Sequence, residues 1–482
     1  MLAVGWWGMR RAKSKSDFLV AGRRLGPSLY SGTMAAIVLG GASTIGGVGL
    51  GYKFGLSGAW LVFSIGFGLL ALSVFFSARI SRLKVYTVSQ MLDLRYGGSS
   101  SVISGLVMWA YTLMLAVTST IAYATIFDVI FGLDRALAII LGGGIVIAYS
   151  TLGGMWSITL TDMAQFVVKS VGVLLLLLPI AVYKAGGIDG MREQLPDGYF
   201  SPMSIGIQTV FTYVLIYSFG MLIGQDIWQR VFTARSDKVA RSGGTVAGIY
   251  CLVYAIAGAV IGTATKALHP KLDSPDAAFA TIVGESLPVG VKGLVLAAAL
   301  SAVMSTSSGA LIACATVANN DIWTRLRHTA QRAVSPGASD GTDPGAHDEV
   351  RGNRIFILIM GTAVVAISIA LNDVVEALTV AYNLLVGGLL VPILGGLIWK
   401  RGNATGALAA TAVGGVTVVA VMAWKGILAN EPIYYGLLAS LLTHVVVSLL
   451  TRPTDPAVLA AWRARLAGES QPEEKTDAPA AL

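Results

Sequence analysis

Hydroxyl side chains are concentrated in the apolar stretch SAVMSTSSGALIA, residues 301–313. If this stretch is helical, Ala302, Ser305 and Thr306 stand at positions i, i+3 and i+4 and share one face. Two hydroxyl groups and a main-chain carbonyl on one face can bind a hard cation, which prefers oxygen ligands. Two alternatives stay open, because such hydroxyls also bond to carbonyls of their own helix or join neighbouring helices.

Glycine clusters interrupt two other apolar segments. Pairs stand at 40–41 and 46–47 within the segment 26–50, and Gly220 and Gly224 interrupt a later segment. Glycine costs a helix about 1 kcal/mol relative to alanine. The clusters therefore indicate either close helix packing or a break whose freed carbonyls line an ion site.

Two ionisable residues, Asp162 and Lys169, lie within a further apolar segment, 157–183. An ionisable group inside a membrane helix is a functional hypothesis in its own right. The two residues are nearly two helical turns apart, so they share a face at a separation of about 10 Å. The alternatives are that Asp162 is a helix-end carboxylate in interfacial water and that Lys169 extends its ammonium to the membrane surface.

The elements that position these residues are predicted to be membrane-spanning helices. Only 12% of the 482 residues are charged, against about 25% in a typical soluble domain, and the mean hydropathy is +0.72. A span needs roughly 20 apolar residues. We expect an all-α, polytopic membrane protein with twelve full spans, at about 26–50, 57–78, 101–131, 136–150, 157–183, 203–224, 243–265, 289–318, 355–371, 374–399, 405–424 and 434–451.

The glycine breaks fall in the first and sixth spans, which is the spacing that two inverted five-helix repeats would produce. We therefore expect a core over 26–399, with one repeat over 26–183 and a second over 203–399. Two additional transmembrane helices follow within 400–451.

The apolar stub 1–9 reaches only about 13 Å as a helix, so it forms a partial span. It is either half a helix or the end of one that begins upstream of Met1, and we favour the upstream start. If the basic segment 10–25 is cytoplasmic, alternation of the spans puts most of the 34 Lys and Arg residues on the cytoplasmic side. This predicts a multi-pass protein of the cytoplasmic membrane, with a flexible loop at 319–354 and a partly disordered, cytoplasmic tail at 452–482.

Other function classes find little support. The basic residues lie in short loops between apolar runs, which argues against a nucleic-acid partner, and no obligate protein partner is evident. The four His residues lack ligand spacing, and no phosphate-binding loop or nucleophile motif occurs, so we do not expect an enzyme.

Several motifs, taken together, resemble the sodium:solute symporter family, and the match runs from about residue 17 to residue 451. The motifs are SDFLVAGRRLGP (16–27), YSTLGGMWS (149–157) followed by TDMAQ, GQDIWQRVFTARSDKVAR (224–241) and STSSGALIACATVANNDIW (305–323). The resemblance implies the inverted-repeat fold of the leucine transporter. It also implies a small organic solute and sodium as partners within the lipid bilayer.

The resemblance further implies which residues bind sodium. The ligands would be the carbonyls of Ala36, Leu39 and Ala302 with the hydroxyls of Ser305 and Thr306. This set contains the helix face that the spacing alone identifies.

The resemblance associates Asp162 with sodium passage or a second ion site, whereas Lys169 is not part of the family motif and its role stays open. Substrate-facing positions would be Ser43, Tyr217 and Thr379.

The solute itself is not predicted. The proline branch of the family has an aspartate where this chain has Val38, and the galactose branch has a glutamate where it has Val62 and a glutamine near Thr379. We expect sodium-coupled symport into the cell by alternating access. The alternatives are a proton-coupled symporter that uses Asp162 and a solute sensor without transport, and the short tail after residue 451 argues against the sensor.

Overall fold

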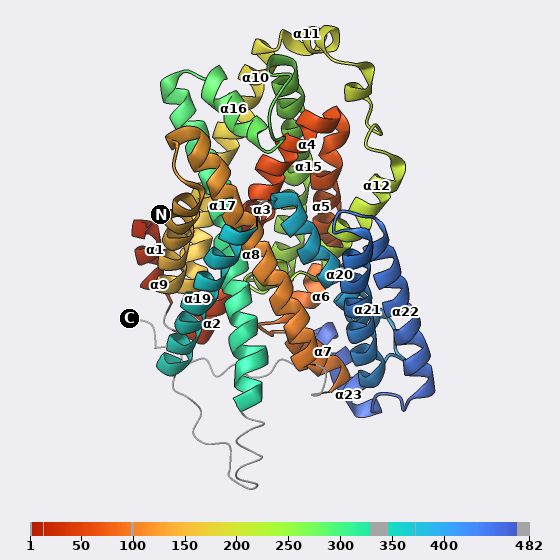
Figure 1. Ribbon diagram of the computed structural model, residues 1–482. Helices are drawn as coiled ribbons and strands as arrows, with labels where there is room; N and C mark the ends of the chain where they lie inside the picture. Colours follow the sequence, from red (N-terminus) through yellow and green to blue (C-terminus); the bar gives the residue numbers. More distant parts are fainter. Residues whose placement is uncertain (1, 13, 98–100, 328–345, 372, 470–482) are drawn as a thin grey trace.

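The computed structural model describes all residues except 1, 13, 98–100, 328–345, 372 and 470–482 (Figure 1). The described residues are largely helical, and their one β-type pairing is an isolated parallel bridge between Leu25 and Ala234. The helices of the first half of the chain are α1 (Leu2–Met9), α2 (Lys15–Val20), α3 (Pro27–Val38), α4 (Gly47–Phe54), α5 (Trp60–Ala71), α6 (Ser77–Arg82), α7 (Val88–Tyr96), α8 (Ser101–Phe131), α9 (Arg135–Lys169), α10 (Leu178–Lys184) and α11 (Gly187–Gln194).

The second half of the chain continues the all-helical pattern. Its helices are α12 (Ile207–Tyr213), α13 (Phe219–Ile223), α14 (Gln225–Val231), α15 (Asp237–Leu268), α16 (Ala277–Ser286), α17 (Val289–Val317), α19 (Ala346–Ala370), α20 (Val374–Ile398), α21 (Ala404–Lys425), α22 (Glu431–Leu450) and α23 (Pro456–Ala467). Short 3₁₀ or π-helical segments join several of them, at Ala21–Arg23, Ala42–Gly46, Gly55–Ala59, Leu72–Phe76, Ser170–Leu177, Asp197–Phe200, Val214–Ser218 and Ala318–Trp323.

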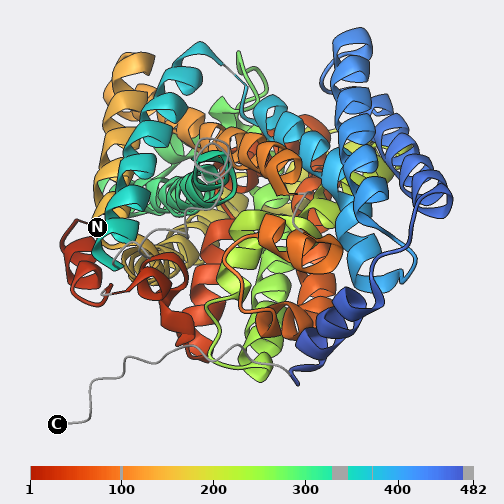
Figure 2. The ribbon, with the colours of Figure 1, turned by 90° about the horizontal axis from the view of Figure 1, so that it is seen from below.

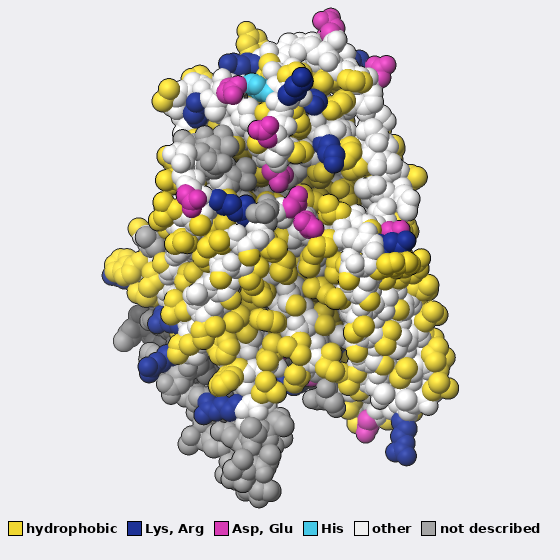
Figure 3. Space-filling view, viewed as in Figure 1, with side chains coloured by type: hydrophobic (Ala, Val, Ile, Leu, Met, Phe, Trp, Pro, Cys, Tyr) yellow, Lys and Arg dark blue, Asp and Glu magenta, His cyan; other side chains and the backbone are white. Residues whose placement is uncertain are grey.

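The molecule has the surface of a membrane protein. On the face that Figure 3 shows, hydrophobic side chains form a broad band, and most charged side chains lie above and below it. Among the described residues, nine helical runs are long and apolar enough to cross a membrane, or ten if a bent pair is one span. The expected all-α, polytopic class is thus confirmed, whereas the count of twelve spans stays a prediction. Some of these runs join neighbouring predicted spans, as Arg135–Lys184 does.

That long run is interrupted at Gly154, inside α9. Gly154 has φ 55° and ψ −139°, a conformation that L side chains rarely adopt. A Cβ at this position would come within 2.4 Å of the Phe18 carbonyl oxygen, so glycine is also required for the close approach of α2. The kink separates the two segments that the sequence predicts at 136–150 and 157–183.

The first core helix is broken where the first glycine pair predicts a break. Helix α3 ends at Val38, and Leu39 has the non-helical angles φ −100° and ψ 68°. The chain then resumes as the π-helical turn Ala42–Gly46, which leads into α4. The later glycines of this segment serve packing instead, since a Cβ on Gly51 would lie 2.6 Å from a main-chain oxygen of α15.

The second predicted break is also present. Gly224 has ψ 131°, and the helices before and after it are bent by 44° relative to each other. Gly220, by contrast, remains within α13, where its missing Cβ leaves room for the ring of Tyr382. Only one of the two glycines therefore interrupts this helix.

Helix α17 carries the hydroxyl-rich stretch through the middle of the bundle. It packs mainly on α8 and α9, and it also contacts α3 and α14 beside the two breaks. The pair α21 and α22 stands at the side of the bundle, against α20 (Figures 1 and 2). The hydroxyl side chains are thus buried within the bundle, and those of Ser305 and Thr306 face the interrupted helix α3.

The predicted cytoplasmic segments lie together at one end of the molecule (Figure 1). Arg82 Nε donates to Asp237 at 2.6 Å, Arg23 Nη2 donates to the Val85 carbonyl at 3.2 Å, and Leu25 N donates to Thr233 O at 3.0 Å.

The tail contains a docked helix that the sequence analysis did not predict. Helix α23 lies across α6 and α7 at this end of the bundle (Figure 2), and its Trp462 side chain is buried. Arg82 Nη1 donates to the Leu466 carbonyl oxygen at 3.2 Å. The expected disorder at 470–482 falls outside the described residues.

The N-terminal stub and the long loop are both partly helical. The N-terminal stub forms the short helix α1, which packs on α9 through a hydrogen bond from Ser157 Oγ to the Gly5 carbonyl. The loop expected at 319–354 is shorter, because helical structure extends to Arg327 and resumes at Ala346. Its centre, 328–345, lies outside the described residues.

Candidate functional site

The hydroxyls of α17 reach the carbonyls that the break in α3 leaves without helical partners. Ser305 Oγ donates to the Ala36 carbonyl at 2.7 Å and to the Ala302 carbonyl at 3.0 Å. Thr306 Oγ1 donates to the Ile37 carbonyl at 2.5 Å. All of these groups are buried. The break and the hydroxyl face are therefore in direct contact.

Glycine makes this approach possible. A Cβ on Gly40 would lie 2.2 Å from Thr306 Oγ1 and 2.5 Å from Thr306 Cβ, and a Cβ on Gly41 would lie 2.7 Å from the Ala122 side chain. The sequence left two explanations for the glycine pair at 40–41, a helix break and close helix packing. The structure shows both at these two residues.

Lys169 lies in the same place. Its Nζ donates to the Leu39 carbonyl at 2.9 Å and to the Ala36 carbonyl at 3.3 Å, and the residue has no exposed surface. The ring of Tyr254 lies 5.9 Å from Nζ. Lys169 therefore does not extend to the membrane surface. Its ammonium binds two of the carbonyls expected to bind sodium.

Asp162 forms a second buried polar cluster, closer to the start of α3. Thr33 Oγ1 donates to Asp162 Oδ2 at 2.5 Å, and Arg230 Nη2 lies 3.3 Å from the same oxygen. Both members of the ion pair have fully buried side chains. Asp162 is thus not a carboxylate in interfacial water, and its partner is Arg230 rather than Lys169. Its second oxygen, Oδ1, has no hydrogen-bond partner among the described residues.

The remaining hydroxyls of the stretch have other partners. Ser308 Oγ donates to the Ser305 carbonyl at 3.1 Å within the same helix, and Ser307 Oγ lies 3.2 Å from Thr120 Oγ1 of α8. Both alternatives for these hydroxyls, back-bonding and joining helices, are therefore present in the stretch, and Ser305 does both. Cation binding by Ser305 and Thr306 stays a prediction.

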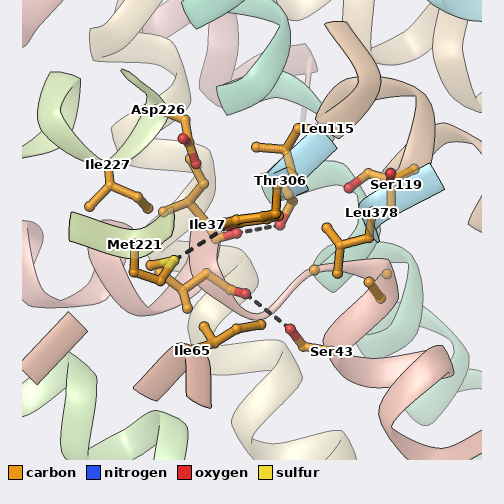
Figure 4. A pocket seen from close by; sticks show the side chains of 16 residues that line it. Ile37, Ser43, Ile65, Leu115, Ser119, Met221, Asp226, Ile227, Thr306 and Leu378 are labelled. Atoms are coloured by element: carbon orange, nitrogen blue, oxygen red, sulfur yellow. Dashed lines mark hydrogen bonds between the residues drawn. The ribbon is translucent and has the colours of Figure 1, made fainter. Parts of the chain in front are cut away.

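A small cavity, with an accessible volume of about 20 Å³, adjoins the two breaks. Figure 4 shows its lining, with hydrogen bonds from Thr306 to Ile37 and from Ser43 to Val38 drawn as dashed lines. Side chains from both halves of the chain meet here. The lining residues are Ile37, Val38, Gly40, Gly41, Ala42, Ser43, Ile65, Leu115, Thr118, Ser119, Met221, Asp226, Ile227, Thr306, Leu378 and Tyr382.

Of the three positions expected to face a solute, Ser43 lines this cavity. Tyr217 and Thr379 do not line it, but their hydroxyls lie 3.2 Å apart. The Tyr217 ring packs edge-on against Tyr382, at 5.5 Å between ring centroids, and Tyr382 does line the cavity. Tyr217 and Thr379 thus stand one layer behind the lining.

Asp226 and Arg230 are two further buried charges at this site that were not predicted from the sequence. Asp226 lines the cavity and accepts a hydrogen bond from the Tyr111 hydroxyl at 2.8 Å. Arg230 holds Asp162, as described above. A usable signal was present, because both charges closely follow the glycine that ends the apolar segment 203–224.

Comparison with known proteins gives consistent results. A model of the sodium:solute symporter family matches residues 18–414. The osmoregulated proline transporter OpuE of Bacillus subtilis is 25% identical, over 94% of this chain and 93% of its own length. A sodium/proline symporter of Staphylococcus aureus is 26% identical, over 94% and 91%.

Solved structures resemble the fold. A substrate-bound, outward-open Na⁺-coupled sialic acid symporter superimposes with a TM-score of 0.81 at 18% identity, over 94% of this chain and 96% of that one. Mhp1, a nucleobase-cation-symport-1 family transporter in a closed conformation, gives a TM-score of 0.55 at 16% identity, over 95% and 99%.

Proposed function

Because the chain belongs to the sodium:solute symporter family and hence carries out sodium-coupled solute symport, we propose that sodium binds where the break in α3 meets α17. The ligands are the carbonyls of Ala36, Leu39 and Ala302 and the hydroxyls of Ser305 and Thr306. The observation that carries this proposal is the reach of Ser305 Oγ across to the Ala36 carbonyl, at 2.7 Å. It supports a shared oxygen site between two helices, and oxygen atoms are the ligands that hard cations prefer.

Sodium at this point ties α3 to α17 and favours the conformation in which the two helices are held together. An ion shifts a conformational balance only as far as it binds one state better than the other. Coupling follows if the joined conformation is also the one that binds the solute. This is alternating access, with sodium as the ligand that selects the solute-binding state.

The solute binds in the cavity beside the two breaks. Ser43 supplies a hydroxyl there, while Tyr217 and Thr379 support the wall from behind. Asp226 adds a buried carboxylate, which fits a solute that presents an ammonium group or another hydrogen-bond donor. Proline, the solute named for several relatives, is therefore a test solute, although Val38 stands where the proline branch has an aspartate.

Asp162 serves a second ion site or the ion pathway. Its free oxygen, Oδ1, supports this role, because a buried carboxylate oxygen without a partner is costly unless an ion or water binds it. The same residue would carry the coupling proton if the transporter used protons instead of sodium. The protein resides in the cytoplasmic membrane, with α23 and the basic segment 10–25 on the cytoplasmic side.

Uptake into proteoliposomes tests the function. The purified protein should accumulate its solute under an inward sodium gradient and lose this accumulation when choline replaces sodium. The panel should contain proline, other amino acids, monocarboxylates, sugars and amines. Equal uptake of the transported solute with choline and with sodium would exclude sodium coupling.

Variants of α17 test the sodium site. A lost charge-assisted oxygen contact is worth roughly 1.5–3 kcal/mol, which corresponds to about a tenfold to hundredfold loss of affinity. Ser305→Ala and Thr306→Ala should therefore raise the half-saturating sodium concentration of uptake by such factors. Ser308→Ala, whose hydroxyl donates to the Ser305 carbonyl within α17 and is not among the proposed ligands, is the matched control and should change little. Unchanged sodium curves in both site variants would contradict the assignment.

A further inference from the structure

The short helix α1 ends in a cluster of aromatic and basic side chains at the edge of the bundle. Trp6 and Trp7 are 49% and 48% exposed, and Arg10 and Arg11, both exposed, follow directly after the helix. Helix α1 packs on α9 and lies at the perimeter of the molecule in two perpendicular views (Figures 1 and 2). The chain therefore changes from apolar to basic at a point that faces the surroundings of the bundle rather than its interior.

Each of the two arginines is stacked on a tryptophan ring. Arg10 Cζ lies 3.9 Å from the centre of the Trp6 ring, and Arg11 Cζ lies 4.5 Å from that of Trp7 and 5.3 Å from that of Trp156 in α9. Stacking uses the flat face of a guanidinium group and leaves the N–H donors at its rim free to bind an oxygen ligand. The rings thus hold both guanidinium groups in place without consuming their hydrogen bonds.

The positive charge of this cluster is not neutralised by the protein. Among the residues that the structure describes, neither guanidinium has an ion pair or a hydrogen bond with another residue. The sequence from 10 to 24 contains six basic residues but a single acidic one, Asp17, and this aspartate pairs with Arg24. By contrast, Arg82 of α6 is held by Asp237. The rim donors of Arg10 and Arg11 therefore point to a ligand from outside the chain.

We propose that Arg10 and Arg11 bind the phosphate of an anionic phospholipid, whose acyl chains lie against Trp6 and Trp7. A guanidinium group binds phosphate oxygens through two parallel N–H donors, and the stacked geometry presents such donors. Tryptophan rings are typical of the headgroup level of a membrane. The exposed position of both indoles, next to the two arginines, fits a ligand that joins a phosphate to hydrocarbon.

The charge balance selects the class of lipid. The site offers two cations and no carboxylate among the described residues, so a headgroup with net negative charge is favoured there. A zwitterionic headgroup would bring its own cation close to Arg10 and Arg11, which costs electrostatic energy. A soluble phosphate would engage the arginines but would leave the two exposed indoles without a partner. The arrangement therefore favours an anionic lipid over both.

Native mass spectrometry of the purified protein, titrated in detergent with phosphatidylglycerol or phosphatidylcholine, tests the proposal. The parent should bind phosphatidylglycerol more tightly than phosphatidylcholine. Each basic residue near an anionic lipid surface is worth roughly fivefold in affinity, so Arg10→Gln/Arg11→Gln should weaken phosphatidylglycerol binding by about 25-fold. Binding of phosphatidylcholine should change little.

The matched control removes the same charge at the other end of the molecule. Lys184→Gln/Arg192→Gln changes two exposed cations of α10 and α11, and Arg192 is also stacked on an aromatic ring, that of Phe200 at 5.5 Å. This variant should bind phosphatidylglycerol like the parent. Because Arg10 and Arg11 are exposed, their double variant should also keep the melting temperature of the parent in the absence of lipid.

Three results would overturn the proposal. Equal loss of phosphatidylglycerol binding in both double variants would show that net charge alone attracts the lipid. Equal affinity of the parent for the two lipids would show that the headgroup charge is not recognised. Displacement of phosphatidylglycerol by inorganic phosphate at millimolar concentration would assign the arginines to a soluble anion. The last two tests use the parent protein, so they apply even if the variant at Arg10 and Arg11 does not fold.

Discussion

At the scale of single residues, we expect stability to depend strongly on the buried ion pair of Asp162 and Arg230. Both side chains are fully buried, so neither can turn to water if its partner is removed. Leaving one charge of a buried pair unpaired costs about 3–5 kcal/mol of folding free energy. We expect a loss of about this size for either partner here. Exposed pairs are worth about 0–1 kcal/mol.

We therefore expect Arg230→Met to lower the apparent melting temperature in detergent strongly. The double variant Asp162→Asn/Arg230→Met should recover much of the loss, since it leaves no buried charge unpaired. Arg24→Met, which removes the largely exposed partner of Asp17, is the control and should have a small effect. A double variant no more stable than Arg230→Met would show that the pairing does not explain the loss.

Among the residues at the cavity, Asp226 is the one whose substitution should change the affinity for solute most directly. Its carboxylate lines the cavity and is held by Tyr111. We expect Asp226→Asn to weaken solute binding by roughly tenfold or more, because a hydrogen bond to a charged group is worth about 1.5–3 kcal/mol. The half-saturating sodium concentration should change much less. Two uptake curves separate the effects on solute and sodium affinity. One varies the solute concentration at saturating sodium, and the other varies the sodium concentration at saturating solute. A change confined to the sodium curve would place Asp226 in the ion site instead.

These residues also show what the sequence could and could not reveal. Helical spacing alone placed Ala302, Ser305 and Thr306 on one face, because that relation is local to one helix. The partner of Lys169 was beyond reach, since it depends on how α9 lies against the end of α3, more than a hundred residues away in the chain. Asp226 was missed for the same reason, because it joins the cavity only through the bend at Gly224.

At the scale of elements, the carbonyls at the break in α3 can share an ion with α17 only if the two helices approach each other closely. Gly40 is the contact point, as a Cβ there would overlap Thr306. We expect Gly40→Ala to force the two helices apart at a cost of about 1–3 kcal/mol, which corresponds to roughly a fivefold to hundredfold rise in the half-saturating sodium concentration.

The control for this variant is Gly415→Ala in α21, where an added Cβ meets no atom within 4 Å. It should leave sodium-dependent uptake unchanged. Sodium curves of Gly40→Ala that match those of Gly415→Ala would show that the close approach is not needed for ion binding.

Helix boundaries were predictable where composition changes abruptly, and less so where helices bend. The glycine pair at 40–41 marked a real break, but Gly220 looked equivalent to Gly224 and instead makes room for Tyr382. Sequence gives the cost of a glycine in a helix, not whether a neighbour fills the space that it leaves. Helix α23 was missed because its stability comes from docking on α6 and α7.

At the scale of the whole molecule, the orientation in the membrane can be tested by labelling. The basic segments lie together at one end of the bundle, with α23 beside them, and the positive-inside rule assigns that end to the cytoplasm (Figure 1). Cysteines introduced by Ser16→Cys and Ala457→Cys should react with a membrane-impermeant maleimide only after permeabilisation. The native Cys251 and Cys314 are buried and should add little background.

Asp189→Cys supplies the opposite control, because α11 lies at the other end of the molecule (Figure 1). It should react in intact cells. Labelling of Ser16→Cys or Ala457→Cys in intact cells would reverse the proposed orientation.

The buried pair of Asp162 and Arg230 also bears on the electrical work done by the membrane. Its two charges are opposite and lie side by side, so a conformational change that moves them together carries no net charge through the membrane field. A membrane potential of 100 mV contributes about 2.3 kcal/mol per net charge moved. For this pair the contribution is close to zero, and the potential would act on the sodium ion that enters with the solute.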